Sequence, residues 1–236
     1  MIRAVLFDVD DTLCDDRGQM IRCIARTSEE AARLAGGIDA SALARAYQAI
    51  SDRFWHFEFS LDAPPPLDVV RRRLWRDALT ASGTAPTDEV IEPVIALYDA
   101  LRREPVTAFP GTLETLAALH GRGLILAALT NGFSETHVPK LERLGAGPYF
   151  SEIFTPDRLG VAKPDPRAFH LACAALGVAP GETVHVGDSP SADIGGAKGA
   201  GLRAVWFNPD GLTLPDGTPA PDREISAISE LLTYLS

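Results

Sequence analysis

The chain has 236 residues, of which 46% are hydrophobic, and its 22 lysines and arginines face 32 aspartates and glutamates, which gives a formal net charge of -10. Because domains commonly contain about 100 to 200 residues, this length allows one full hydrophobic core and a smaller second one. The negative charge disfavours a nucleic acid polymer or an anionic membrane as a partner, and it is compatible with a small ligand that brings its own cation.

Two carboxylates follow the first predicted strand. The apolar run Ala4–Phe7 predicts a buried strand, and Asp8 and Asp10 come directly after it in the order Asp-Val-Asp-Asp-Thr. Burial and mutual repulsion both raise the free energy of paired ionised carboxylates. The arrangement therefore favours a site at which a cation and a reacting group use these side chains.

The segment 17–104 lacks strand-like alternation and predicts one helix after another, with breaks at Gly36-Gly37, 64–66 and 83–86. We therefore predict an all-helical cap, 17–104, inserted into an α/β core of 1–16 and 105–236. Such a cap can close over the carboxyl ends of the strands, exclude water, and set substrate specificity by contacting the leaving group of the substrate.

Aromatic residues and arginines of the cap are candidates for contacting the substrate, although aromatics at this spacing more often pack helices and a run of arginines usually forms a solvated face. These candidates are Trp55, His56, Phe57 and Phe59, together with Arg71, Arg72, Arg73 and Arg76.

After residue 105, strand-like and helix-like segments alternate, which is typical of an α/β fold with a parallel sheet. We expect strands at 124–129, 153–154, 183–186 and 203–207, and helices at 112–120, 135–144, 166–176, 190–200 and 224–235. Asp165 before Pro166, and Ser189 before Pro190, predict helix N-caps followed by a proline in the first turn. The proline-rich stretch 214–221 predicts a surface loop.

Further polar groups lie in the loops of this predicted core. They are Thr130, Asn131 and Gly132 after the second strand, Lys163 in a Lys-Pro-Asp-Pro loop after the third, and Asp188 and Asp193 after the fourth. Ligands of open parallel sheets bind outside the carboxyl ends of the strands, so we expect these groups to converge near Asp8. The prolines stiffen the Lys163 loop, from which the ammonium can reach the carboxylates. Each group alone has an ordinary explanation as a turn, a solvated charge or a helix cap, and only the conjunction predicts a site.

The remaining reactive residue types predict no second site. No stretch approaches the roughly 18 apolar residues of a membrane span, and the first apolar run ends at Asp8 without forming a signal-peptide core, so we expect a soluble cytoplasmic protein. The cysteines show no CxxC spacing, which indicates neither a disulfide framework nor a zinc site. They are Cys14, Cys23 and Cys173. The histidines show no ligand spacing, and we assign no role to His56, His120, His137, His170 or His185.

The carboxylates after the first strand, the Thr130 run, the Lys163 loop and the carboxylates after the fourth strand resemble, in this order, the four motifs of the haloacid dehalogenase superfamily. The resemblance extends over nearly the whole chain. Residues 8–12 are similar to the first motif, 130–131 to the second, 163–164 to the third and 187–193 to the fourth. The resemblance implies a Rossmannoid parallel sheet flanked by helices, with a helical (C1-type) cap between the first and second motifs. Asp11 stands where glycine is frequent in the family, and other phosphatase branches carry an acidic or amide residue there.

The resemblance also implies chemical roles. Asp8 would be the nucleophile that forms an aspartyl phosphate, Asp10 the acid/base, and Thr130 and Lys163 phosphoryl ligands. A carboxylate is a recognised phosphoryl acceptor, and a displacement in two steps needs a group that protonates the leaving oxygen and then activates water. Backbone donors near Asn131 and Gly132 would bind the transferring oxygens.

Mg²⁺ is the expected cofactor, because hard divalent cations prefer oxygen ligands. By the resemblance, Asp188 is a magnesium ligand. We expect Asp8, the backbone carbonyl of Asp10 and Asp188 in the inner coordination shell, with Asp193 nearby or in the outer shell.

Asp10 favours phosphate esters over haloacids, because dehalogenases of the family lack an aspartate at this position. We therefore predict a magnesium-dependent phosphomonoester hydrolase for a small soluble metabolite, such as a nucleoside monophosphate or a sugar phosphate. The runs 129–133 and 206–208 are most similar to the nucleotidase-like branch. A phosphomutase or phosphotransferase on the same site, and a catalytically idle metabolite-binding protein, remain open. We expect a monomer or a homodimer.

Overall fold

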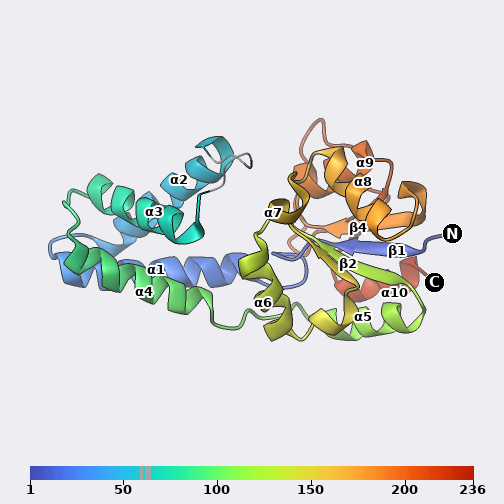
Figure 1. The fold of residues 1–236 in the computed structure, drawn as a ribbon, viewed down its shortest axis with the longest axis horizontal. Helices are drawn as coiled ribbons and strands as arrows, with labels where there is room; N and C mark the ends of the chain where they lie inside the picture. The colour runs from blue at the N-terminus through green and yellow to red at the C-terminus, as the bar shows by residue number, and fades with distance from the viewer. Residues whose placement is uncertain (59–60, 62–64) are drawn as a thin grey trace. The chain divides into compact units, whose positions relative to one another are not determined.

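The computed structural model describes residues 1–58, 61 and 65–236. The chain divides into two compact units, a core unit formed by Met1–Asp16 with Pro105–Ser236 and a helical unit formed by Arg17–Glu104 (Figure 1). Each unit has hydrophobic clusters of its own. Within the described ranges, every helix is too short or too polar to cross a lipid bilayer.

The core unit is built on a six-stranded sheet with the order β3-β2-β1-β4-β5-β6, in which all neighbours are parallel. The strands are β1 (Ala4–Phe7), β2 (Ile125–Leu129), β3 (Glu152–Phe154), β4 (Thr183–Gly187), β5 (Arg203–Phe207) and β6 (Arg223–Ile225). The chain runs outward from β1 through β2 and β3 on one side, and through β4 to β6 on the other. The switch point between β1 and β4 is where ligands of such sheets bind, at the carboxyl ends of the strands. The predicted α/β fold class is confirmed.

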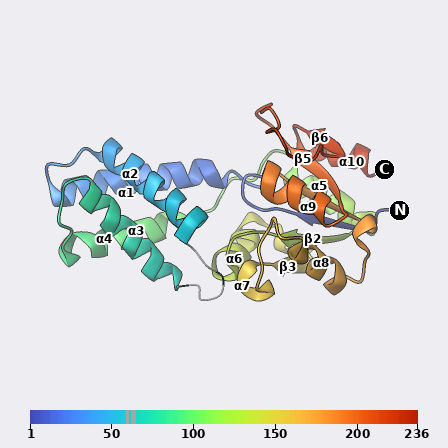
Figure 2. The same ribbon diagram turned by 90° about the horizontal axis from the view of Figure 1, so that it is seen from above.

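Helices cover both faces of this sheet (Figures 1 and 2). They are α5 (Thr112–Gly121), α6 (Ser134–Leu144), α7 (Pro156–Leu159), α8 (Pro166–Ala175), α9 (Gly196–Gly199) and α10 (Leu231–Tyr234). Since side chains alternate along a strand, Val5 and Phe7 of β1 pack in one cluster with α5, α6 and α10, while Ala4 and Leu6 pack in the other with α8 and α9. Burial on both faces explains why β1 and β2 are continuous apolar runs.

The predicted N-caps are confirmed. Asp165 accepts a hydrogen bond from the backbone of Arg167 at the start of α8, and Ser189 accepts one from Ala192. The predicted helix 190–200 is divided into a π-helical turn, Pro190–Gly195, and α9.

The predicted helix 224–235 is wrong in its first part. Arg223–Ile225 forms β6, which pairs with β5 and places Ile225 opposite Phe207. A 3₁₀ turn, Ile228–Glu230, and the short α10 follow. Ile225 is only 1% exposed, so burial beside β5 outweighs the weak helix preference of this segment.

The helical unit contains α1 (Asp16–Ala35), which begins at the last residue of the core unit's first segment, α2 (Ala40–Arg53), a π-helical turn (Phe54–Glu58), α3 (Leu67–Ala81) and α4 (Asp88–Arg102). Its core is centred on Trp75, which is fully buried and stacks on Tyr47 with ring centroids 4.2 Å apart. Tyr98 packs edge-on against Trp75.

The arginines singled out in the sequence lie in ion pairs inside the helical unit. The pairs are Arg71 with Asp99, Arg72 with Glu92, Arg73 with Glu58 and Arg76 with Asp88. Trp55 is 39% exposed and packs edge-on against Phe54. Phe59 and the side chains of His56 and Phe57 lie outside the described residues, so their suggested role stays a prediction.

Candidate active site

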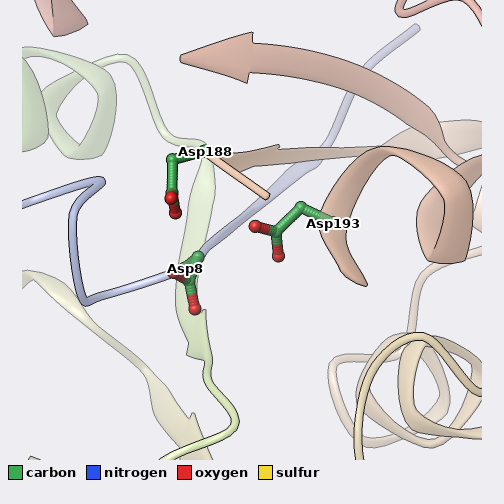
Figure 3. A group of neighbouring side chains, drawn as sticks. All are labelled: Asp8, Asp188 and Asp193. Carbon is green, nitrogen blue, oxygen red and sulfur yellow. The ribbon is translucent and has the colours of Figure 1, made fainter. Parts of the chain in front are cut away.

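Three carboxylates meet at the switch point of the sheet (Figure 3). Asp8 follows β1, Asp188 follows β4, and Asp193 comes from the π-helical turn after β4. One oxygen from each lies within 4.8 Å of the others. The parallel strand order thus brings together side chains that are up to 185 positions apart in the sequence.

Lys163 is the cation of this cluster. Its Nζ donates to Oδ1 of Asp8 and to Oδ1 of Asp193, both at 2.6 Å, and the residue is 5% exposed. The Asn131 side chain fixes the lysine backbone through two bonds of 2.9 Å, because Nδ2 donates to the Lys163 carbonyl and Oδ1 accepts from its N–H. Asn131 therefore anchors the loop that presents Lys163.

Both oxygens of Asp193 already accept hydrogen bonds. Oδ1 accepts from Lys163 and lies 2.8 Å from Nε2 of His185, and Oδ2 accepts from the backbone of Ser189. His185 is fully buried on β4 and received no role from the sequence. Asp193 packs so closely on Gly187 that a Cβ there would lie 2.2 Å from its carboxyl carbon. This carboxylate is held as an internal partner of the site.

The cluster carries more negative charge than Lys163 can balance. Burial raises the pKa of Asp8 well above its ordinary value, and Asp193 and Asp188 add to this rise against the opposing effect of Lys163. Burial, followed by repulsion from Asp193 and Asp11, raises the pKa of Asp188 to about 6. Although burial opposes its ionisation, Lys163 keeps a pKa above its usual range because of Asp193 and Asp8.

This charge imbalance fits a divalent cation. Asp8 and Asp188 supply hard oxygen ligands, and a cation beside them would offset the repulsion that adds to the effect of burial in raising their pKa values. Asp193 already makes three hydrogen bonds, to Lys163, His185 and Ser189, and suits the outer shell. The Asp10 carboxylate does not belong to the three-carboxylate group, because it points to other partners.

Those partners lie on α6. Oδ2 of Asp10 is 2.9 Å from Nε2 of His137, and Oδ1 accepts from Nζ of Lys140 at 2.5 Å. Lys140 also donates to Asp16 at 2.7 Å. Burial opposes ionisation of Asp10, but His137 and Lys140 outweigh it and hold the pKa of this carboxyl far below its usual range. The sequence analysis assigned no role to either partner. Both follow the Thr130 motif, and they lie three positions apart on one face of α6.

The Thr130 loop is shaped by His137. The N–H of Gly132 donates to Oγ1 of Thr130 at 3.1 Å, which leaves the threonine hydroxyl hydrogen available for a ligand. A Cβ on Gly132 would lie 1.7 Å from the imidazole of His137, so a larger residue there would have to displace this ring. The helix α6 begins at Ser134, two residues after Gly132.

The turn after Asp8 explains the residue type at position 11. Asp11 has a φ of 59°, in the left-handed region that glycine adopts without strain and aspartate tolerates better than most residues. The next residue, Thr12, donates through Oγ1 to Asp188 at 3.1 Å. The turn thus joins the first and fourth motifs. All three cysteines are buried and form no disulfide bond.

The chain is similar to known hydrolases and phosphatases. The model of the haloacid dehalogenase-like hydrolase family matches residues 2–201. The chain is 39% identical over 161 residues to the phosphoserine phosphatase of Thermus thermophilus, a match that covers 68% of this chain and 63% of that enzyme, which is less than two thirds of its length. It is 30% identical to the glyceraldehyde 3-phosphate phosphatase of Methanopyrus kandleri, over 98% of this chain and 96% of that one. The crystal structure of a 2-haloacid dehalogenase from Pseudomonas syringae has a TM-score of 0.71 and 32% identity, covering 100% and 98% of the two chains.

Proposed function

Because the chain belongs to the haloacid dehalogenase-like hydrolase family, we propose that it is a magnesium-dependent phosphatase that hydrolyses a small phosphate monoester. The observation that carries this proposal is the contact of Asp8 with Lys163 beside Asp188 at the switch point of the sheet. A nucleophilic carboxylate, a fixed cation and a ligand for a divalent metal are the parts that phosphoryl transfer requires.

Because His137 and Lys140 favour the ionised form of Asp10, this carboxylate first takes up a proton from solvent. In the first step, an oxygen of Asp8 attacks phosphorus, the bond from phosphorus to the leaving oxygen breaks, and Asp10 gives that proton to the leaving oxygen. In the second step, water loses a proton to Asp10 and attacks the aspartyl phosphate, which releases phosphate and restores Asp8. Lys163 and the hydroxyl of Thr130 would bind the phosphoryl oxygens throughout.

Mg²⁺ held by Asp8, Asp188 and the backbone carbonyl of Asp10 would neutralise charge on the phosphoryl group when bound. Asp193 holds Lys163 in place from the outer shell. Asn131 supports the same lysine from its other side, and backbone donors near Asn131 and Gly132 remain further proposed contacts of the phosphoryl group.

The substrate class that we propose is a small phosphorylated metabolite. The similar enzymes are named for phosphoserine and glyceraldehyde 3-phosphate, both alkyl esters of few carbons. Sugar phosphates and nucleoside monophosphates extend the same class.

The test is phosphate release from p-nitrophenyl phosphate and a panel of these esters, with Mg²⁺ and with a chelator. We expect turnover that requires the metal, is lost in Asp8→Asn and is retained in Asp216→Asn, a matched change at an exposed loop carboxylate. Metal-independent turnover that survives Asp8→Asn would overturn the mechanism. Transfer of the phosphoryl group to a second hydroxyl without free phosphate would identify a mutase instead.

A second candidate function comes from the similar structure that is named a 2-haloacid dehalogenase. Halide release from a 2-haloacid distinguishes it, because that displacement leaves a stable halide and needs no proton donor such as Asp10. We expect no halide release from the wild-type protein.

A further inference from the structure

We propose that His137 and Lys140 are positioning residues that hold the carboxylate of Asp10 for proton transfer at the leaving oxygen. The inference rests on the proposed phosphatase function. The two side chains come from one face of α6, at positions i and i+3, and each takes a different oxygen of Asp10. The carboxylate is thereby fixed both in position and in rotation.

The imidazole of His137 is itself held from several sides. Nδ1 lies 2.9 Å from Oγ1 of Thr136, whose hydroxyl hydrogen goes to the carbonyl of Phe133. The ring rests against Gly132, where a Cβ would overlap it. Nε2 is left to face Asp10, so His137 has one orientation available.

Lys140 is fixed by a second carboxylate. Its Nζ bridges Asp10 and Asp16, with contacts of 2.5 and 2.7 Å. Asp16 is 7% exposed and lies 6 positions after Asp10. Both ends of the turn that follows the nucleophile are thus tied to one ammonium group.

The distribution of burial argues for positioning beyond mere stabilisation. The side chains of His137 and Lys140 are 6% and 7% exposed, whereas that of Asp10 is 32% exposed. Two buried side chains therefore converge on a carboxylate that is itself about one third exposed. Such a geometry leaves Asp10 accessible to a ligand while its supports stay enclosed.

A leaving-group comparison tests the proposal. 4-Nitrophenolate departs from phosphorus without a proton, whereas an alkoxide needs one, so misplacing Asp10 should harm alkyl esters selectively. We expect His137→Ala and Lys140→Met to lower kcat/KM for the best alkyl ester of the panel about 10- to 100-fold more than kcat/KM for p-nitrophenyl phosphate. KM for the alkyl ester should change less than about 3-fold, because ground-state binding is not involved.

Further variants and a metal titration separate positioning from general damage to the fold. Asp10→Asn should show the same selective loss, and Asp10→Asn combined with His137→Ala should be no worse than Asp10→Asn alone. Lys140→Arg should recover most of the activity that Lys140→Met loses, and His120→Gln, a change at an exposed histidine of α5, should leave both esters unaffected. Calorimetric titration should show unchanged Mg²⁺ affinity in His137→Ala and in Lys140→Met.

Equal losses for the two esters, additive losses in the double variant, or increased alkyl ester turnover in His137→Ala would each overturn the positioning role. A wild-type protein that hydrolyses neither ester would instead contradict the proposed function. If His137→Ala does not fold, Lys140→Met and His137→Gln provide the same comparison.

Discussion

Nζ of Lys163 lies 2.6 Å from Oδ1 of Asp8, and the same ammonium contacts Asp193, so one buried cation holds two buried carboxylates. These contacts connect stability and the proposed chemistry at a single residue. Removing one partner of a buried ion pair leaves an uncompensated charge, which is more destabilising than exchanging the whole pair.

Lys163→Met should therefore reduce both stability and turnover. We expect a loss of about 3–5 kcal/mol in unfolding free energy at pH 7 and a fall in kcat of about 10²- to 10³-fold. The stability difference should shrink between pH 7 and pH 5, because the unpaired carboxyls can then take up protons. Urea unfolding at both pH values checks this, with Lys198→Met, at an exposed ion pair, as the control. A variant as stable as the wild type at pH 7 would contradict the prediction.

Gly132→Ala should displace His137. Its Cβ would lie 1.7 Å from the imidazole, so we expect a destabilisation of about 1–3 kcal/mol and weakened activity on alkyl esters. Combining Gly132→Ala with His137→Ala should relieve the overlap, and the double variant should be about as stable as His137→Ala alone. Gly121→Ala, where a Cβ meets nothing within 4 Å, is the matched control. Additive destabilisation would show that the overlap is not the cause.

Mg²⁺ binding should depend on pH through Asp188. The Asp188 carboxyl has a pKa of about 6 in the folded, metal-free protein and about 3.9 in the unfolded chain. Between these two pH values, the folded protein keeps the carboxyl proton that the unfolded chain has lost. Metal-free stability should therefore fall as pH rises from about 4 to about 6, and Mg²⁺ should offset that fall.

Since the cation competes with the proton, apparent Mg²⁺ affinity should decrease about tenfold per pH unit below pH 6. Calorimetric titrations in two buffers of different ionisation enthalpy at pH 5, 6 and 7 measure both the affinity and the protons released. Asp216→Asn should leave both unchanged. Affinity that is constant across this range would exclude Asp188 as a titrating ligand.

Asp8 should capture a phosphoryl analogue. With Mg²⁺, beryllofluoride should add to its carboxylate and raise the melting temperature by several degrees, because a ligand that binds only the folded state stabilises it. Asp8→Asn should abolish the shift, whereas Asp216→Asn should preserve it. A crystal structure with the analogue attached elsewhere would refute the assignment of the nucleophile.

The core unit should fold without residues 17–104. Asp15 donates to the carbonyl of Thr107 at 2.9 Å, so the two ends of the segment to be removed lie close together. Among the described residues, the two clusters that flank the sheet draw only on the core unit. We expect a Gly-Ser linker in place of this segment to preserve a cooperative thermal transition and to alter substrate preference. A chain without such a transition, or with an unchanged substrate profile, would count against this domain assignment and the proposed role of the helical unit.

The elements that the sequence predicted well are those with continuous burial. β1 and β5 have the predicted bounds, and β2 agrees with prediction to within one residue, because the part of each strand that is covered on both faces is apolar. The three residues of β6 carry no such pattern, since Arg223 and Glu224 are exposed and only Ile225 is buried. Pairing beside β5 decides their conformation, and that contact is not local.

The hydrogen-bond partners of Asp10 and Asp193 could not be predicted from the sequence, for a similar reason. A single histidine, such as His137 or His185, has no spacing that distinguishes a hydrogen-bond partner of Asp10 or Asp193 from a packing residue. The contacts that give these histidines a role join residues 127 and 8 positions apart, respectively. Lys140 likewise differs from an ordinary surface lysine only through its contacts with Asp10 and Asp16.

By itself, the sequence determined the fold class and the residues of the four motifs, because apolar periodicity and the position of a polar group after a strand are local properties of the chain. The tertiary structure decided which groups each carboxylate contacts: Asp10 contacts His137 and Lys140 of α6, Asp193 makes three hydrogen bonds within the core unit, and Asp8 and Asp188 complete the three-carboxylate group. Charge interactions depend on distances of a few ångströms in a buried environment, and only the packed sheet and its helices set those distances.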